Sequence, residues 1–98
     1  MKFKNPLLAV TDMAASICFY RRVLGLRVVR DFGANVTLSG GGCRQTLDTW
    51  REFLDGRPVS LGGNAAELYF EEDDFDAFAK QLSELEIEYV HPVKEHRW

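Results

Sequence analysis

Residues 7–29, LLAVTDMAASICFYRRVLGLRVV, constrain the fold most strongly, because they encode a strand, a helix and a second strand in succession. The apolar run Leu7 to Val10 has the length of a buried strand. Thr11-Asp12 follows, and short oxygen-bearing side chains of this kind cap helix N-termini. Gly25 suits the left-handed position that ends a helix. Between these signals, four apolar residues recur on one helical face: Met13, Ile17, Tyr20 and Leu24.

The same pattern occurs a second time, 61 residues further along the chain. This shift superposes Asp12 on Asp73 and Leu24 on Leu85, and the second copy reads AELYFEEDDFDAFAKQLSELEIEYV over residues 66–90. Asp73 or Asp74 is expected to cap its helix. The expected apolar face consists of Phe75, Phe78, Ala79, Leu82 and Leu85. A repeat of this length indicates a duplicated supersecondary module, since one module does not bury its own apolar face.

The remaining strands of the first module are expected close together in the chain. The first strand should cover residues 2–10, and three more should cover 27–32, 35–39 and 43–47. Ser39-Gly40-Gly41-Gly42 is typical of a hairpin connection where positive φ is needed. Residues 1–47 are therefore predicted to form a βαβββ module.

A connector over residues 48–63 is expected to hold a short helix capped by Asp48 or Thr49, and a brief strand at 59–61. Two interpretations stay open for the connector: a lid over the sheet, or a surface link with Trp50 filling a gap in the core. The second module, 64–98, should contain a strand, the second helix and a strand at 87–90, followed by a short tail. The second module has too few residues after this strand to form hairpins like those of the first module. Either the natural protein continues further or a partner chain supplies the missing strands.

Several motifs in both copies resemble the vicinal oxygen chelate superfamily, which includes glyoxalase I, bleomycin-resistance proteins and extradiol dioxygenases. The resemblance rests on Val10-x-Asp12, Ser16, Phe19-Tyr20, Leu24-Gly25 and, in the second copy, EEDDFDAF. It implies an α+β fold of two tandem βαβββ modules, the second incomplete, whose sheets curl around a shared cleft. Residues 1–98 would then form a single domain. Such modules often pair across subunits, so a homodimer is expected.

The resemblance also implies a divalent metal in the cleft, and among the corresponding residues the carboxylate of Glu67 is the one charged ligand. Asn5 stands where the superfamily places its first histidine, and Gln45 lies near a position that can hold glutamate. Glu67 lies one residue beyond the equivalent of Asn5 in the second module. An amide oxygen is a poor substitute for imidazole, and divalent-cation sites normally gather more than one charged ligand. We therefore predict no metal ligands and no cofactor, although a divalent metal stays an alternative, and we assign no catalytic residue.

The function expected from this pattern is metal-free binding of a small molecule in the cleft, similar to that of bleomycin-resistance proteins. Polar groups of the ligand would be oriented by Asn5, Gln45 and Glu67. Apolar and stacking contacts would come from Trp50, Tyr69 and the tail, with His96 and Trp98 at the cleft mouth. Two alternatives stay open: a metal-dependent lyase or dioxygenase of the glyoxalase type, and an interaction domain with a vestigial cleft. Whether the protein is an enzyme is not decided.

Charge and cysteine content exclude several classes of partner. The net charge is −3 and the pI is about 5.3, which gives no electrostatic basis for binding nucleic acid. The apolar runs are too short to cross a membrane. The beginning of the chain does not resemble a secretion signal. Cys18 and Cys43 are therefore expected to be free thiols in the cytoplasm.

Overall fold

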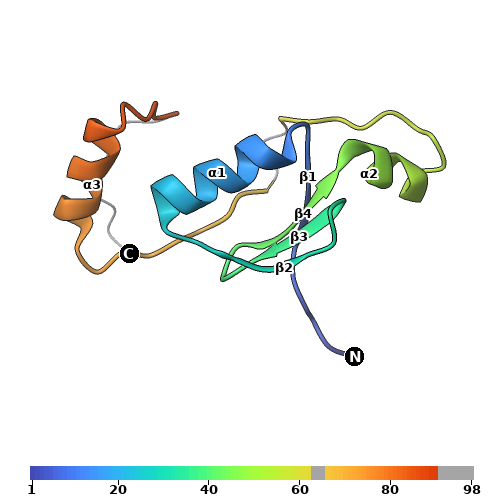
Figure 1. The fold of residues 1–98 in the computed structure, drawn as a ribbon, viewed down its shortest axis with the longest axis horizontal. Helices are drawn as coiled ribbons and strands as arrows, with labels where there is room; N and C mark the ends of the chain where they lie inside the picture. Colours follow the sequence, from blue (N-terminus) through green and yellow to red (C-terminus); the bar gives the residue numbers. More distant parts are fainter. Residues whose placement is uncertain (63–65, 91–98) are drawn as a thin grey trace.

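The computed structural model describes residues 1–62 and 66–90 and has an α+β fold built on a four-stranded mixed sheet (Figure 1). The first module contains β1 (Leu7–Val10), α1 (Met13–Leu24), β2 (Val28–Asp31), β3 (Asn35–Leu38) and β4 (Gly42–Thr46). Two further helices follow, α2 (Leu47–Phe53) and α3 (Phe75–Glu84). The predicted βαβββ order of the first module is confirmed. None of the helices in the described ranges is long and apolar enough to cross a membrane.

Helix α1 has the ends that its sequence predicts. Asp12 is the N-cap, and its Oδ1 accepts a hydrogen bond from the backbone N–H of Ala15 at 3.0 Å. Gly25 ends the helix in the left-handed conformation, with φ of 67°. The strand before it is shorter than the predicted 2–10, because β1 begins only after Pro6. Proline has no N–H to donate to a strand ladder, which favours a strand that starts beyond it.

The sheet has the strand order β1-β4-β3-β2, with β1 parallel to β4 and the other two pairs antiparallel. The Pro6 carbonyl accepts a hydrogen bond from the Cys43 N–H at 3.0 Å, where the chain enters β1. This close approach requires glycine at position 42. A Cβ there would lie 2.6 Å from the Pro6 oxygen, and Gly42 has a φ of 74°. The glycine-rich hairpin is thus needed for backbone contact as well as for turning.

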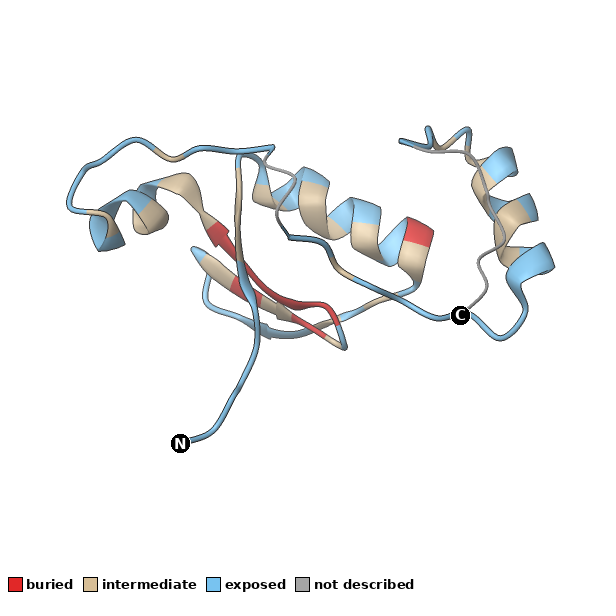
Figure 2. Cartoon of the chain, turned by 180° about the vertical axis from the view of Figure 1, so that it is seen from behind, coloured by how far each residue is buried: buried red, intermediate tan, exposed pale blue. Residues whose placement is uncertain are grey.

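The buried residues concentrate in the two central strands and at one end of α1 (Figure 2). Among the described residues, the buried apolar side chains are Val23, Val36, Leu38 and Cys43. The four residues predicted on one face of α1 are all half-buried. Tyr20 from this face contacts Arg44 of β4, so α1 covers the side of the sheet on which Arg44 lies.

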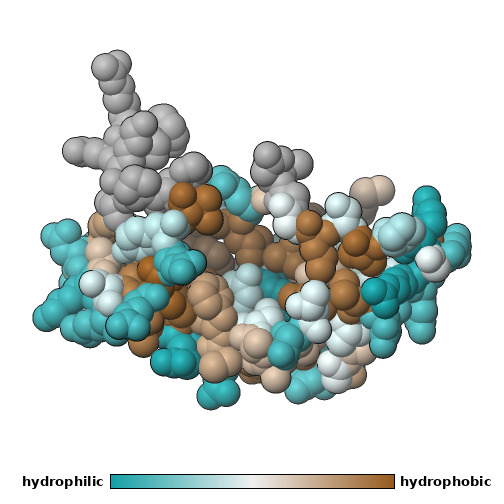
Figure 3. Space-filling view, turned by 90° about the horizontal axis from the view of Figure 1, so that it is seen from above, coloured by the Kyte–Doolittle hydropathy of each residue, from teal (hydrophilic) through white to brown (hydrophobic). Residues whose placement is uncertain are grey.

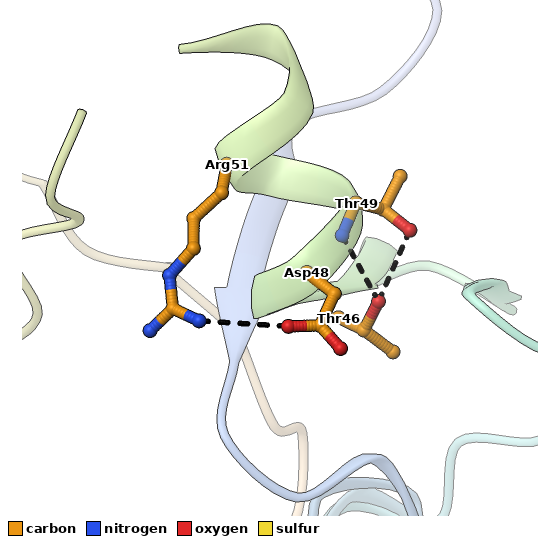
Figure 4. Close-up of polar contacts among 4 residues, drawn as sticks. All are labelled: Thr46, Asp48, Thr49 and Arg51. Carbon is orange, nitrogen blue, oxygen red and sulfur yellow. Dashed lines mark hydrogen bonds and ion pairs between the residues drawn. The ribbon is translucent and has the colours of Figure 1, made fainter. Parts of the chain in front are cut away.

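Helix α2 begins one residue before the predicted capping pair. Thr46, the last residue of β4, is its N-cap, so Asp48 and Thr49 lie inside the helix. The Thr46 hydroxyl contacts both the hydroxyl and the backbone N–H of Thr49, and Arg51 pairs with Asp48 at 3.5 Å (Figure 4). The predicted strand at residues 59–61 is wrong, because this segment makes no strand pairing.

Helix α3 confirms the predicted helix of the second copy, with Asp74 as its N-cap accepting from the Ala77 N–H at 3.1 Å. Its flanks differ from the prediction, because neither 66–70 nor 87–90 forms a strand. The predicted apolar face is half-buried except for Phe75, which is 50% exposed. A hydrogen bond from Gln81 Nε2 to the Arg22 carbonyl, 3.2 Å long, links α3 to α1. The tail, 91–98, lies outside the described residues.

Candidate functional site

The residues predicted to bind a ligand lie in separate parts of the structure. Asn5 is exposed just before β1, and Gln45 is buried in β4. Trp50 is half-buried in α2, while Glu67 and Tyr69 are exposed in the segment 66–70. His96 and Trp98 lie outside the described residues. Asn5, Tyr69 and Glu67 line two adjoining pockets, whereas Gln45 and Trp50 line neither of them.

Gln45 belongs to a row of polar groups on the face of the sheet opposite Arg44. Cross-strand register places Asn35 beside Gln45 and Thr37 beside Cys43. The Asn35 Nδ2 donates to the Gln45 Oε1 at 2.7 Å, and the Thr37 hydroxyl lies 3.2 Å from the Cys43 Sγ. Gln45 is 3% exposed, and its Nε2 has no hydrogen-bond partner. The pair thus offers a buried donor on this face.

These residues do not fit the divalent metal that the superfamily implies. The Gln45 oxygen accepts from Asn35, and its free nitrogen is a donor, whereas a metal needs a lone pair. Asn5 offers a neutral oxygen, which leaves Glu67 as the one charged member of the set. Across the described ranges, no group of three or more His, Cys, Asp or Glu side chains is placed to hold a metal.

A mainly apolar pocket of about 510 Å³ lies between α1, β1 and the segment 66–70. Seen from the side of α1, apolar side chains gather in the middle of the molecule (Figure 3). Glu67 is the charged residue in the lining of this pocket. The other lining residues are Pro6, Leu8, Phe19, Tyr20, Leu24, Ala66, Leu68 and Phe70. We refer to this cavity as the apolar pocket. Concave apolar sites with a few polar groups are typical of small-molecule binding.

A smaller, more polar pocket of about 250 Å³ adjoins it, and we call it the glycine pocket. The two cavities share Pro6, Leu68 and Phe70 in their linings. The remaining lining residues of the glycine pocket are Phe3, Lys4, Asn5, Gly40, Gly41, Gly42 and Tyr69. A ligand that spans both cavities would place an apolar body in one and a polar group in the other.

Arg44 contacts one lining residue of each pocket, and no sequence pattern pointed to it. Its guanidinium carbon is 4.1 Å from the centre of the Tyr20 ring, and Tyr20 lines the apolar pocket. Its Nη1 donates to the carbonyl of Gly41, which lines the glycine pocket, at 2.6 Å. Arg44 is fully buried. An arginine inside a short strand carries no sequence signal for this position, because burial depends on which sheet face the helix covers.

The fold and the pockets define an α+β protein of the βαβββ type with a mainly apolar, partly open pocket. A family model described as the glyoxalase-like domain matches residues 3–98. The chain therefore belongs to the glyoxalase-like domain family, part of the vicinal oxygen chelate superfamily, which confirms the resemblance seen in the sequence.

A solved structure shares this fold. The chain is similar to a protein of unknown function from Agrobacterium tumefaciens str. C58, with a TM-score of 0.86 and 31% sequence identity. The match covers 100% of this chain and 79% of the Agrobacterium chain. The search of curated proteins found no match.

Proposed function

We propose that the protein binds a small organic molecule in the apolar pocket without a metal ion. The observation that carries this proposal is the apolar pocket itself, whose 510 Å³ lies within the usual range for ligand sites, about 300–1,000 Å³. Aromatic rings from Phe19, Tyr20 and Phe70 can contact a flat or branched apolar group. Glu67 adds a carboxylate that can orient one polar group of the ligand.

Titration with benzyl alcohol, followed by NMR of the protein, tests this proposal. We expect saturable shifts at residues that line the apolar pocket, unchanged by a chelator. Ala66→Trp should weaken binding because it places an indole in the pocket, and Ala66 is exposed enough to accept the change. Ala77→Trp is the matched control, since Ala77 is exposed on α3 and does not line the pocket. Stoichiometric metal in the purified protein, or equal binding by the two variants, would contradict the proposal.

We also propose that the protein forms a homodimer. Across the described residues four apolar side chains are buried, while many large ones stay exposed, including Phe32 at 70% and Phe53 at 67%. Exposed apolar surface of this extent is typical of interaction sites. Sedimentation analysis of the purified protein measures the oligomeric state, and a monomer at all concentrations would contradict the proposal.

We infer that the protein works in the cytoplasm. This inference is supported by its two cysteines, because both Cys18 and Cys43 are free thiols in the structure. Fractionation of cells that produce the protein tests it, and recovery outside the cytoplasmic fraction would contradict it.

A further inference from the structure

We propose that Arg44 is a receptor for an oxyanion and that the ligand of the apolar pocket is an acid with a carboxylate or phosphate head group. This inference deepens the proposed function and rests on it. It starts from the buried guanidinium, whose charge the described contacts leave unbalanced.

The guanidinium of Arg44 is held in a fixed orientation. The Tyr20 ring covers one face at 4.1 Å, a cation–π contact. At one corner, Nη1 donates to the Gly41 carbonyl at 2.6 Å and to the Cys43 carbonyl at 3.2 Å. Three contacts from α1, the hairpin and β4 therefore hold the plane of the group in place before any ligand arrives.

The two nitrogens without a partner are Nε and Nη2. In arginine these two atoms point their N–H groups along the same edge, the edge that pairs with both oxygens of a carboxylate or phosphate. Unpartnered donors on different edges of the guanidinium could not pair with both oxygens of one anion. Here they form a complete two-pronged fork, and the third nitrogen, Nη1, is the one that fixes it in place.

The charge of Arg44 also lacks a counter-ion. Arg44 is 0% exposed, and within the described part of the chain the ion pair that forms is between Arg51 and Asp48. A buried charge without a partner is strongly unfavourable, because desolvation is not repaid by Coulomb attraction. An oxyanion at the Nε/Nη2 edge would supply both the charge and the two missing hydrogen bonds.

The surroundings favour entry of an anion from the glycine pocket. Lys4, Asn5 and Tyr69 line this pocket and provide a cation and polar groups. Gly41 lines the pocket with backbone alone, and a Cβ at position 41 would lie 2.9 Å from Leu26 Cδ1 and 3.7 Å from Arg44 Nη2. Because the fork is closed to solvent, binding must shift the hairpin backbone at Gly41. Gly40 and Gly42 flank it, and both have the positive φ that favours glycine.

The arrangement selects an amphipathic acid. Since the two pockets adjoin, an apolar body fits the apolar pocket while the head group approaches Arg44. Glu67 in the lining and the net charge of −3 both disfavour a second negative charge on the ligand. A monoanionic carboxylate is therefore favoured over a phosphate monoester.

The test compares probes that differ in the head group: benzoate, phenyl phosphate, benzyl alcohol and acetate. Binding is followed by NMR at the Arg44 Nε–H signal, which we expect benzoate and acetate to shift downfield. Benzoate should bind the wild-type protein at least about tenfold more tightly than benzyl alcohol. Tighter binding of phenyl phosphate than of benzoate would support the oxyanion receptor and identify a phosphate ester as the ligand source.

Variants of Arg44 distinguish the effect of its two-pronged hydrogen-bonding edge from the effect of its positive charge. Arg44→Met and Arg44→Lys should both lose the preference for benzoate, because neither carries the two-pronged edge, and both should still bind benzyl alcohol. Gly41→Ala would place a Cβ 2.9 Å from Leu26 Cδ1 and 3.7 Å from Arg44 Nη2, so it should weaken benzoate binding by displacing the groups around the fork. Arg30→Met is the matched control, since Arg30 is an exposed strand arginine of β2.

The outcomes distinguish this inference from the proposed function. Equal binding of benzoate and benzyl alcohol, with no change in Arg44→Met, would overturn the oxyanion receptor and leave the apolar pocket as a binding site. Failure of benzyl alcohol to bind would contradict the proposed function, while an acetate-induced shift at Arg44 would still support the receptor. An Arg44 Nε–H signal that no anion shifts overturns the inference.

Discussion

At the scale of single residues, β4 places two unusual polar groups on opposite faces of the sheet. Arg44 faces α1, and Gln45 faces away from it. The unpartnered buried side-chain atoms among the described residues belong to these two residues. Buried polar groups are normally satisfied, so their concentration on one strand suggests a functional rather than a structural role. The sequence predicted Gln45 as a site residue from the resemblance, and it gave no sign of Arg44.

The hydrogen bond between Asn35 and Gln45 should contribute measurably to stability. We expect Asn35→Val to destabilise the protein by about 1–3 kcal/mol, because the Gln45 amide would then have no side-chain partner at either atom. Adding Gln45→Leu to that variant should recover part of the loss, since no buried polar group remains. Chemical denaturation of the wild type, both single variants and the double variant measures the coupling. Strictly additive effects would contradict the pairing.

At the scale of secondary-structure elements, the sequence predicted helices better than strands. Both long helices carry their start signals locally, in Asp12 and Asp74. A strand needs a partner, and its sequence does not say whether one is present. This explains why the apolar segments 59–61, 66–70 and 87–90 were predicted as strands although the described sheet contains none of them. A cleft lined by Asn5, Glu67 and Tyr69 was expected, but the contribution of α1 to the pocket was not, because the path of 66–70 beside α1 is a tertiary contact.

The two equivalent caps offer a direct comparison between the modules. We expect Asp12→Ala to reduce the free energy of unfolding by about 1 kcal/mol, because the Ala15 N–H loses its acceptor. Asp74→Ala removes the corresponding bond to Ala77. It should cost less, since α3 buries none of its residues. Asp12→Asn is the control that keeps a capping oxygen. Thermal and urea unfolding measure all three variants, and a larger loss for Asp74→Ala would show that α3 is integrated more tightly than its exposure indicates.

At the scale of the whole molecule, the described chain has one well-paired sheet, but only a small core of buried residues packs around it. The βαβββ module explains this, since such a module leaves apolar surface for a second unit to cover. The family assignment agrees with the motifs read from the sequence, and the structure adds where the unpaired surface lies. Strands β1 and β2 form the two edges of the sheet. The edge at β1 lies near the segment 66–70, because both line the apolar pocket. The edge at β2 has no hydrogen-bonded neighbour among the described residues.

The outer edge of β2 is therefore where we expect a second copy of the chain to pair. Its backbone groups are free on that side, Val29 is 53% exposed, and Phe32, just beyond the strand, is 70% exposed. Free edges can add another strand, and a partner strand here must accommodate Arg30, Asp31 and the bulge between Val28 and Arg30. Val29→Lys should accordingly weaken self-association by at least about tenfold, because a lysine would be buried at the contact. Ala14→Lys, on the exposed side of α1, should leave it unchanged. Sedimentation equilibrium measures both variants. If Val29→Lys dimerised as tightly as the wild type, the contact would have to lie on another face. The exposed side chains around α3 would then be the next surface to test.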